Sequence, residues 1–109
     1  MRVAVIGSRS KSVPNLNIYL PVECTELVSG GATGVDYSAR LYAKVNRISI
    51  TEFLPDYSRF GRYAPLRRND QIIEYSDMVI AFWDGESRGT KYVINRCKKL
   101  GKPMKIIRV

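Results

Sequence analysis

Histidine is missing from all 109 residues of the sequence, while cysteine occurs twice and tryptophan once. Without an imidazole, the chain has no histidine general base, no serine–histidine triad and few ways to build a zinc site. We therefore expect no metal and no other bound cofactor. Any catalysis would depend on carboxylate, hydroxyl, lysine or arginine side chains.

Cysteine pairs and long apolar runs are missing as well. Cys24 and Cys97 lie far apart and form no CxxC motif, which is typical of a reduced protein and predicts a cytoplasmic location. No apolar run approaches the roughly 18 residues of a transmembrane helix, so no membrane partner is expected. The apolar segment 2–6 is too short for a signal-peptide core and fits a buried first strand.

Acidic residues are few: ten face eighteen lysines and arginines, which gives a net charge of +8. A chain this basic indicates a polyanionic partner, namely a nucleotide, a nucleic acid or another phosphate, without selecting among them. The length fits one domain over residues 1–109, and with 45% hydrophobic residues it can bury a core without metals or disulfides.

Short apolar segments alternate with segments of helical periodicity along the whole chain. Strands are expected at 2–6, 25–28, 48–54, 77–82 and 103–109. Helices are expected at about 12–20, 35–46, 65–75 and 90–100, and residues 56–64 are expected to form a loop. This alternation predicts an α/β, Rossmann-like fold of about five mainly parallel strands, with helices on both faces of the sheet.

The unusual segments all follow the carboxyl end of a predicted strand, where ligands bind in parallel sheets. These segments are Gly7-Ser8-Arg9, residues 29–36, residues 56–64 and residues 83–90. We therefore expect them to meet at one edge of the sheet.

Two of these segments are glycine-rich strand-to-helix turns, SGGATG at 29–34 and DGESRGT at 84–90. Glycine lets backbone N–H groups approach a ligand, and a helix N-terminus attracts anions, so both turns are candidate phosphate sites. The alternative is that they are only tight turns. The candidate binding residues are Ser29, Gly30, Gly31, Thr33 and Gly34 in the first turn and Ser87, Gly89 and Thr90 in the second.

Several basic and polar residues flank these turns. Gly7 and Ser8 lead to Arg9, which is placed to bind a phosphate with two hydrogen bonds, or else is a solvated surface arginine. Of Arg67 and Arg68, one is expected to face the ligand, and the next residue, Asn69, to bond a base or ribose. The alternative for these three is a basic, solvated helix face.

Two carboxylates and one aromatic residue complete the candidate site. Asp36 is either a helix-capping residue or an acceptor for a ribose hydroxyl, and it is a second choice for catalysis. Asp84 is the first choice for a catalytic carboxylate, with a turn-forming role as the alternative. Trp83 is expected either to wall the pocket against a base or to pack in the core with its indole N–H bonded locally.

Two further segments have open interpretations. The aromatic residues Tyr57, Phe60 and Tyr63 are placed to stack on a base, to pack their loop down, or to contact another subunit. The basic residues between 96 and 108 form a solvated helix face or a contact to nucleic acid.

Five segments, taken in order, resemble the SLOG superfamily, the Rossmann-like fold shared by the Smf/DprA DNA-processing proteins and the LOG nucleotide phosphoribohydrolases. These segments are GSR, SGGATGVD, APLRRNDQII, SDMVIAFWDGESRGT and KKLGKPMKII, and together they reach across nearly the whole chain. The resemblance is strongest to the small YspA/cpYpsA-related branch. It implies a nucleotide or nucleotide-derived ligand with phosphates on the glycine turns, and a homo-oligomer.

One departure from the LOG pattern bears on activity. LOG hydrolases carry a PGGxGTxxE motif with a catalytic glutamate, whereas this chain keeps Gly89 and Thr90 but has Val93 at the glutamate position. A valine neither moves a proton nor stabilises a developing positive charge. We therefore predict a nucleotide-binding protein, as a sensor or a nucleotide-processing enzyme. A nucleic-acid-binding module and an assembly subunit remain the alternatives.

Overall fold

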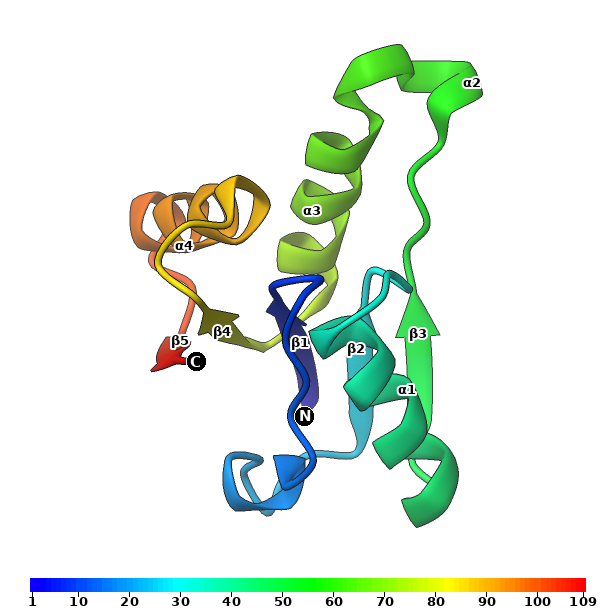
Figure 1. Ribbon diagram of the computed structural model, residues 1–109, viewed down its shortest axis with the longest axis vertical. Coiled ribbons are helices and arrows are strands. Elements are labelled where there is room, and N and C mark those ends of the chain that lie inside the picture. The colour runs from blue at the N-terminus through cyan, green and yellow to red at the C-terminus, as the bar shows by residue number, and fades with distance from the viewer.

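Five parallel strands form one sheet in the order β3–β2–β1–β4–β5 in the computed structural model, which describes residues 1–109 (Figure 1). The strands are β1 Arg2–Gly7, β2 Glu26–Ser29, β3 Ser49–Glu52, β4 Met78–Trp83 and β5 Met104–Arg108. The predicted Rossmann-like α/β fold is confirmed.

The central strands β1 and β4 are apolar along nearly their whole length because helices and loops cover both faces of the sheet. Their register pairs Val3 with Met78 and Val5 with Ile80, while β1 also pairs with β2 on its other side. The edge strands β3 and β5 are more exposed and contain polar residues. The most buried strands therefore end at the middle of the sheet edge.

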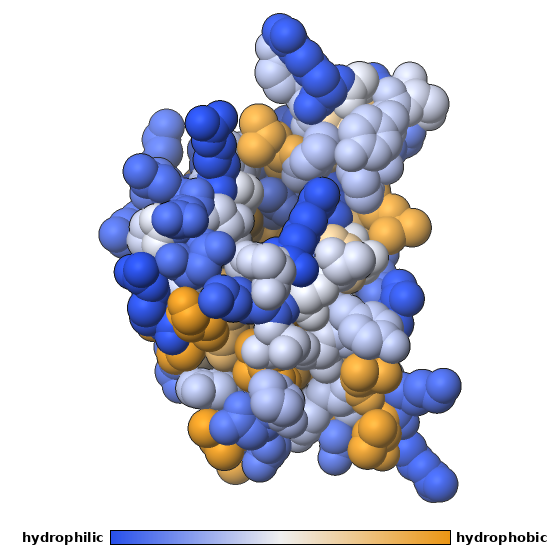
Figure 2. Space-filling model, viewed as in Figure 1, coloured by the Kyte–Doolittle hydropathy of each residue, from blue (hydrophilic) through white to orange (hydrophobic).

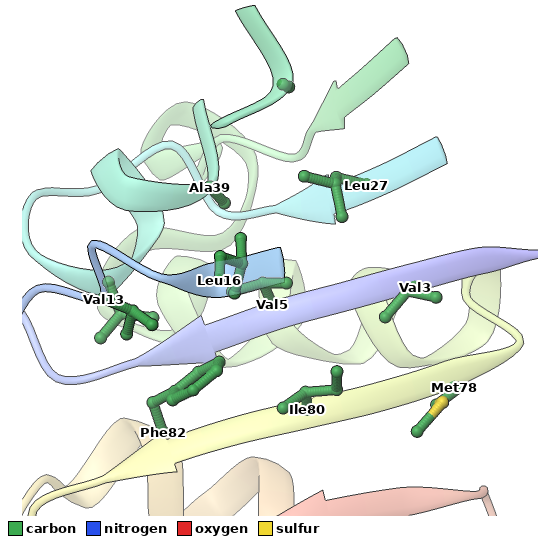
Figure 3. Close-up of a cluster of buried hydrophobic side chains, with 11 residues drawn as sticks. Val3, Val5, Val13, Leu16, Leu27, Ala39, Met78, Ile80 and Phe82 are labelled. Carbon is green, nitrogen blue, oxygen red and sulfur yellow. The ribbon is translucent and has the colours of Figure 1, made fainter. Parts of the chain in front are cut away.

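Each face of the sheet carries its own hydrophobic core. The first core packs α1 (Val35–Asn46) and the segment around the 3-10 helix η1 (Leu16–Ile18) against one face, with Leu16 and Phe82 fully buried (Figure 3). The second core packs α3 (Ala64–Tyr75) and α4 (Arg88–Leu100) against the opposite face. The segment that follows β1 therefore packs on one face of the sheet, while α4, which follows β4, packs on the other.

Two sequence predictions of local structure are wrong. The helix expected at 12–20 is only the three-residue η1, because Pro14 and Pro21 confine the segment and no side chain caps it. The loop expected at 56–64 contains the short helix α2 (Tyr57–Phe60) and the 3-10 helix η2 (Gly61–Tyr63). The carboxylate of Asp56 caps α2 by accepting a hydrogen bond from the Arg59 amide.

The segment α2–η2 lies beyond the carboxyl end of β3, at the top of the molecule in Figure 1. Hydrophilic side chains cover most of the visible surface, with hydrophobic residues gathered in separate small patches (Figure 2). No helix combines the length and the apolar character that a membrane span needs.

Candidate functional site

A cavity of about 600 Å³ opens at the carboxyl edge of the sheet. Its walls come from the turns after β1, β2 and β4 and from the first turns of α3 and α4. It therefore lies where neighbouring strands send their chains to opposite faces, which is the usual ligand position in open α/β sheets. Its volume is within the range of about 300–1,000 Å³ typical of small-molecule sites.

The cavity brings together most of the residues that the sequence predicts for the site. Its lining includes Gly7, Ser8, Arg9, Gly30, Asp36, Arg68, Asn69, Asp84, Ser87, Gly89 and Thr90. A smaller adjoining hollow of about 280 Å³ contains Gly31 and Thr33. The remaining predicted residues, Ser29, Gly34, Arg67 and Trp83, line neither space.

The first glycine turn uses part of its backbone hydrogen-bonding capacity within the protein. The amide of Gly31 donates to Ser29 Oγ at 3.3 Å, and the amide of Ala32 donates to Asp36 Oδ2 at 3.2 Å. Asp36 thus supplies a carboxylate at the start of α1, where the predicted phosphate would have to lie. This turn is consequently a poor anion cradle.

The glycines of this turn are explained by close protein packing. Gly34 has a φ of 71°, and a Cβ there would meet the carbonyl oxygens of Ser8 and Arg9. The Val35 amide reinforces this approach by donating to Ser8 O at 3.1 Å. A Cβ at Gly30 would instead meet the guanidinium of Arg68, at 2.5 Å from Nη1.

The second glycine turn is held by Asp84. Its Oδ1 accepts hydrogen bonds from the amides of Ser87 at 2.8 Å and Glu86 at 2.9 Å, and these bonds lower the pKa of the carboxyl group. Such a carboxylate is a weak base, so the turn-forming role accounts for Asp84 better than the catalytic role does. Ser87 then caps α4, while the amides of Arg88 and Gly89 have no partner within the protein.

A hydrogen bond joins the turns after β1 and β4 across the cavity. Ser8 Oγ donates to Asp84 Oδ2 at 3.1 Å, and it also lies 3.0 Å from Ser10 Oγ. Ser8 is buried, whereas Ser10 is exposed at the cavity mouth. The two neighbouring strand ends are thus connected by side chains as well as by the sheet.

Two charged residues in the cavity wall, Asp36 and Arg68, are each only 7% exposed. Arg68 Nη1 donates to Gly30 O at 2.7 Å, and Arg68 Nε donates to Asn69 Oδ1 at 3.0 Å. Neither Arg68 Nη2 nor Asp36 Oδ1 has a hydrogen-bond partner within the protein. One donor and one acceptor of these two largely buried side chains therefore remain unpaired beside the cavity.

Burial dominates the acid–base behaviour of this pair. It raises the pKa of Asp36, against the opposing effects of the Ala32 amide and the charges of Arg68 and Arg9. Burial also lowers the pKa of Arg68, against the effect of the Asp36 charge. The two side chains form no direct ion pair, so each keeps capacity for a further partner.

Arg9 is the free positive charge of the site. Its side chain is exposed, makes no hydrogen bond or ion pair, and lines both the cavity and the adjoining hollow. Arg67, in contrast, points away, with its guanidinium 3.8 Å from Asp70 Oδ2 and over the ring of Phe60. Of the two arginines considered at the start of α3, Arg68 therefore faces the cavity.

Trp83 packs against the second core, and its indole N–H donates to Ser87 O at 3.1 Å. This is the local-packing alternative rather than a pocket wall. The aromatic side chains of α2–η2 do not line the cavity either. The stacking surface expected for a base is thus missing from the cavity wall, whose apolar part includes Leu66 and Val93.

Sequence reasoning missed several residues of the lining, among them Ser10, Glu86, Pro65 and Leu66. Each directly neighbours a predicted residue or segment, so the available signal was adjacency to the strand ends. From the sequence, Val93 is notable only because it lacks the catalytic carboxylate of the LOG motif. It is buried and contributes an apolar surface to the cavity.

Comparison with protein-family models, with curated proteins and with solved structures finds no match to this chain. The resemblance to the SLOG superfamily consequently stays a prediction from sequence motifs. The interpretation of the site depends on its own geometry and charge.

We expect Asp36→Asn to change how stability depends on pH. Because the pKa of Asp36 is raised in the folded protein, the folded state binds its proton more readily than the unfolded state does. The contribution of Asp36 to stability is therefore greatest at low pH and is lost as pH rises through the raised pKa. The asparagine of the variant does not titrate, so it avoids this loss, and it keeps an oxygen for the Ala32 amide.

The measurement is the free energy of unfolding by urea at a series of pH values from 4 to 8. As pH rises, the free energy of unfolding of the variant should increase relative to that of the wild-type protein. The difference should become constant above the raised pKa of Asp36. No histidine titrates in this range to obscure the difference. Parallel curves for the two proteins would contradict the raised pKa.

Proposed function

We propose that the protein binds a phosphorylated nucleoside in the cavity at the ends of β1 and β4. The observation that carries this proposal is the presence of unpaired donors and an unpaired acceptor in one cavity. Arg9 and Arg68 Nη2 supply positive charge, and Asp36 Oδ1 accepts hydrogen bonds. A phosphorylated nucleoside requires this combination because it carries an anion and sugar hydroxyls close together.

The phosphate is assigned to Arg9, Arg68 and the start of α4. The free amides of Arg88 and Gly89 add donors at the positive end of this helix. A Cβ added at Gly89 would meet no atom within 4 Å, so the backbone here is open to a ligand. The proposal thus moves the phosphate from the first glycine turn to the second.

The sugar is assigned to Asp36. Its second carboxylate oxygen has no partner within the protein, and the residue lines the cavity, so this oxygen is free to accept a hydrogen bond from a sugar hydroxyl. A second phosphate is disfavoured at this position by charge repulsion. Asp36 would therefore select ligands with a hydroxyl-bearing sugar.

Binding is favoured over hydrolysis as the activity. Val93 supplies no proton-transfer group, and the carboxylate of Asp84 is held by three donors with its pKa lowered. Burial raises the pKa of Asp36 in the cavity wall, so Asp36 is the residue to test if turnover of a nucleotide is detected.

The experiment is a thermal-shift panel at low ionic strength with nucleoside monophosphates, nucleoside diphosphates, inorganic phosphate and a short single-stranded oligonucleotide. A ligand present at a hundred times its Kd adds about 2.7 kcal/mol of stability, which raises Tm by more than about 5 °C. We expect Arg9→Glu to weaken nucleotide binding at least about tenfold, because it reverses an unpaired charge in the cavity.

Lys105→Glu is the matched control. It makes the same change in net charge on β5, at an exposed residue outside the cavity. Equal losses of nucleotide affinity in the two variants would show that only overall charge matters, which would count against the cavity as the site.

A single-stranded nucleic acid is the second candidate ligand, and the segment α2–η2 favours it. Tyr57 and Tyr63 are 58% and 55% exposed there, beside the exposed Arg59 and Arg62. Exposed aromatic rings with neighbouring arginines suit base stacking and phosphate contacts. A response to the oligonucleotide alone, abolished by added salt, would support this candidate over the nucleotide.

A further inference from the structure

The hollow beside the cavity contains the feature that the proposed function leaves unused. It has a volume of about 280 Å³ and lies at the ends of β2 and β3, lined by Gly31, Thr33, Leu54 and Pro55. Its size is just below the range of separate small-molecule sites, so it suits one sugar or one base better than a whole ligand.

The hollow and the cavity share part of their walls. Arg9, Gly30, Ala32 and Arg68 line both spaces, so the two are adjacent, with both arginines at their boundary. An anion bound by these arginines would therefore have open space on each side. This arrangement favours a ligand whose negative charge lies in its middle.

The two turns that build the hollow differ in chemistry. Leu54, after β3, is 64% exposed and, with Pro55, offers an apolar surface that suits a base or the apolar face of a sugar. Thr33, after β2, is exposed, and its hydroxyl donates to Arg9 O at 3.5 Å while its oxygen can still accept a hydrogen bond from a sugar or base edge. None of these three side chains carries a charge.

The start of α1 is a weaker site for the central anion than the start of α4, because the Asp36 carboxylate lies there and repels another negative charge. The Ala32 amide is bonded to Asp36, and the Val35 amide is bonded to Ser8 O. The central phosphates then have the two arginines and the free amides at the start of α4 as partners, and two bridging phosphates match two arginines in charge.

We propose that the ligand is a two-part molecule in which a diphosphate joins a nucleoside in the cavity to a second sugar or nucleoside in the hollow. This inference depends on the proposed function, because it extends the same site. It keeps the phosphates on Arg9, Arg68 and the start of α4, and it assigns the hollow to the second half of the ligand.

The test measures affinities by isothermal titration calorimetry for matched probes of each base. For adenine, guanine, cytosine and uracil, the probes are the nucleoside monophosphate, the nucleoside diphosphate and the symmetric dinucleoside diphosphate. We expect the dinucleoside diphosphate of the preferred base to bind at least about tenfold more tightly than the nucleoside diphosphate. The nucleoside diphosphate controls for the number of phosphates, and the nucleoside monophosphate, with about two negative charges like the dinucleoside diphosphate, controls for charge.

Thr33→Trp fills the hollow and is the decisive variant. Thr33 is exposed, has an ordinary backbone conformation and does not line the cavity. We expect the variant to abolish the gain from the second half while leaving the affinity for the nucleoside monophosphate within about twofold. Leu54→Ala, which removes the apolar wall, should reduce the gain without abolishing it.

The possible failures are distinguishable. If monophosphates bind but no dinucleoside diphosphate exceeds its diphosphate control, the two-part ligand is wrong and the proposed function stands. Equal weakening of all probes by Thr33→Trp would likewise overturn the role of the hollow. If none of the probes binds to the wild-type protein, the two-part ligand and the proposed function both fail.

Discussion

Replacing Arg68 with methionine is expected to destabilise the protein by about 3 kcal/mol. Methionine keeps an unbranched stem for packing but leaves Gly30 O and Asn69 Oδ1 without their donors. The buried carboxylate of Asp36 also loses the largest of the charges that oppose its raised pKa. The measurement is the free energy of unfolding by urea at pH 7.

The adjacent arginine provides the control. Arg67 is exposed, and its ion pair with Asp70 spans 3.8 Å, so Arg67→Met is expected to change stability by less than about 1 kcal/mol. The double variant Asp36→Asn with Arg68→Met should lose less than the sum of its parts, because the uncompensated charge is gone. Equal losses for Arg68→Met and Arg67→Met would contradict the buried role of Arg68.

Gly34→Ala is expected to cost at least about 3 kcal/mol, again measured by urea unfolding. The new Cβ would be placed at a φ of 71° and against the carbonyl oxygens of Ser8 and Arg9, which are backbone atoms that cannot rotate away. Relief would require separating the turn after β1 from the start of α1. That movement would break the bond between the Val35 amide and Ser8 O.

Two other glycines separate the causes of this loss. Gly61 has a φ of 58° with no atom within 4 Å of a new Cβ, so Gly61→Ala reports backbone strain alone, about 1 kcal/mol. Gly89 has an ordinary φ and open space in the first turn of α4, so Gly89→Ala should be neutral or stabilise by about 0.5 kcal/mol. If Gly34→Ala destabilises the protein no more than Gly61→Ala does, the turn after β1 moves away from the new Cβ at little cost, and close packing does not explain the glycine at this position.

The fold could be predicted because its signals are local. Apolar runs closed by glycine or proline mark each strand, and the helix expected at 35–46 has the same bounds as α1. The helix predicted at 12–20 does not form, because the segment has a helix start signal but too few apolar residues at helical spacing to pack a full helix against the sheet. The loop predicted at 56–64 contains a short helix instead, because Asp56 caps its start by accepting a hydrogen bond from the Arg59 amide.

The position of the cavity could be predicted from the sequence, but the contacts within its wall could not. Parallel strands bring their carboxyl ends to one edge, so the turns had to meet. The sequence predicts Gly30 as a phosphate-binding residue but gives no sign of its contact with Arg68, which lies 38 positions away in the chain. The sequence does indicate which of Arg67 and Arg68 faces inward. Arg68 lies one helical turn before the buried Ile72, so these two residues are on the same face of α3.

The hydrogen bonds of Asp84 have a consequence for the speed of ligand capture. One carboxylate holds the amides of Glu86 and Ser87 and, through Ser8, fastens the turn after β4 to the turn after β1. These hydrogen bonds connect the two sides of the cavity mouth without any contribution from a ligand. For the proposed anionic ligand, we therefore expect binding without a slow opening step, with an association rate that falls as ionic strength rises, as for encounter with a basic surface.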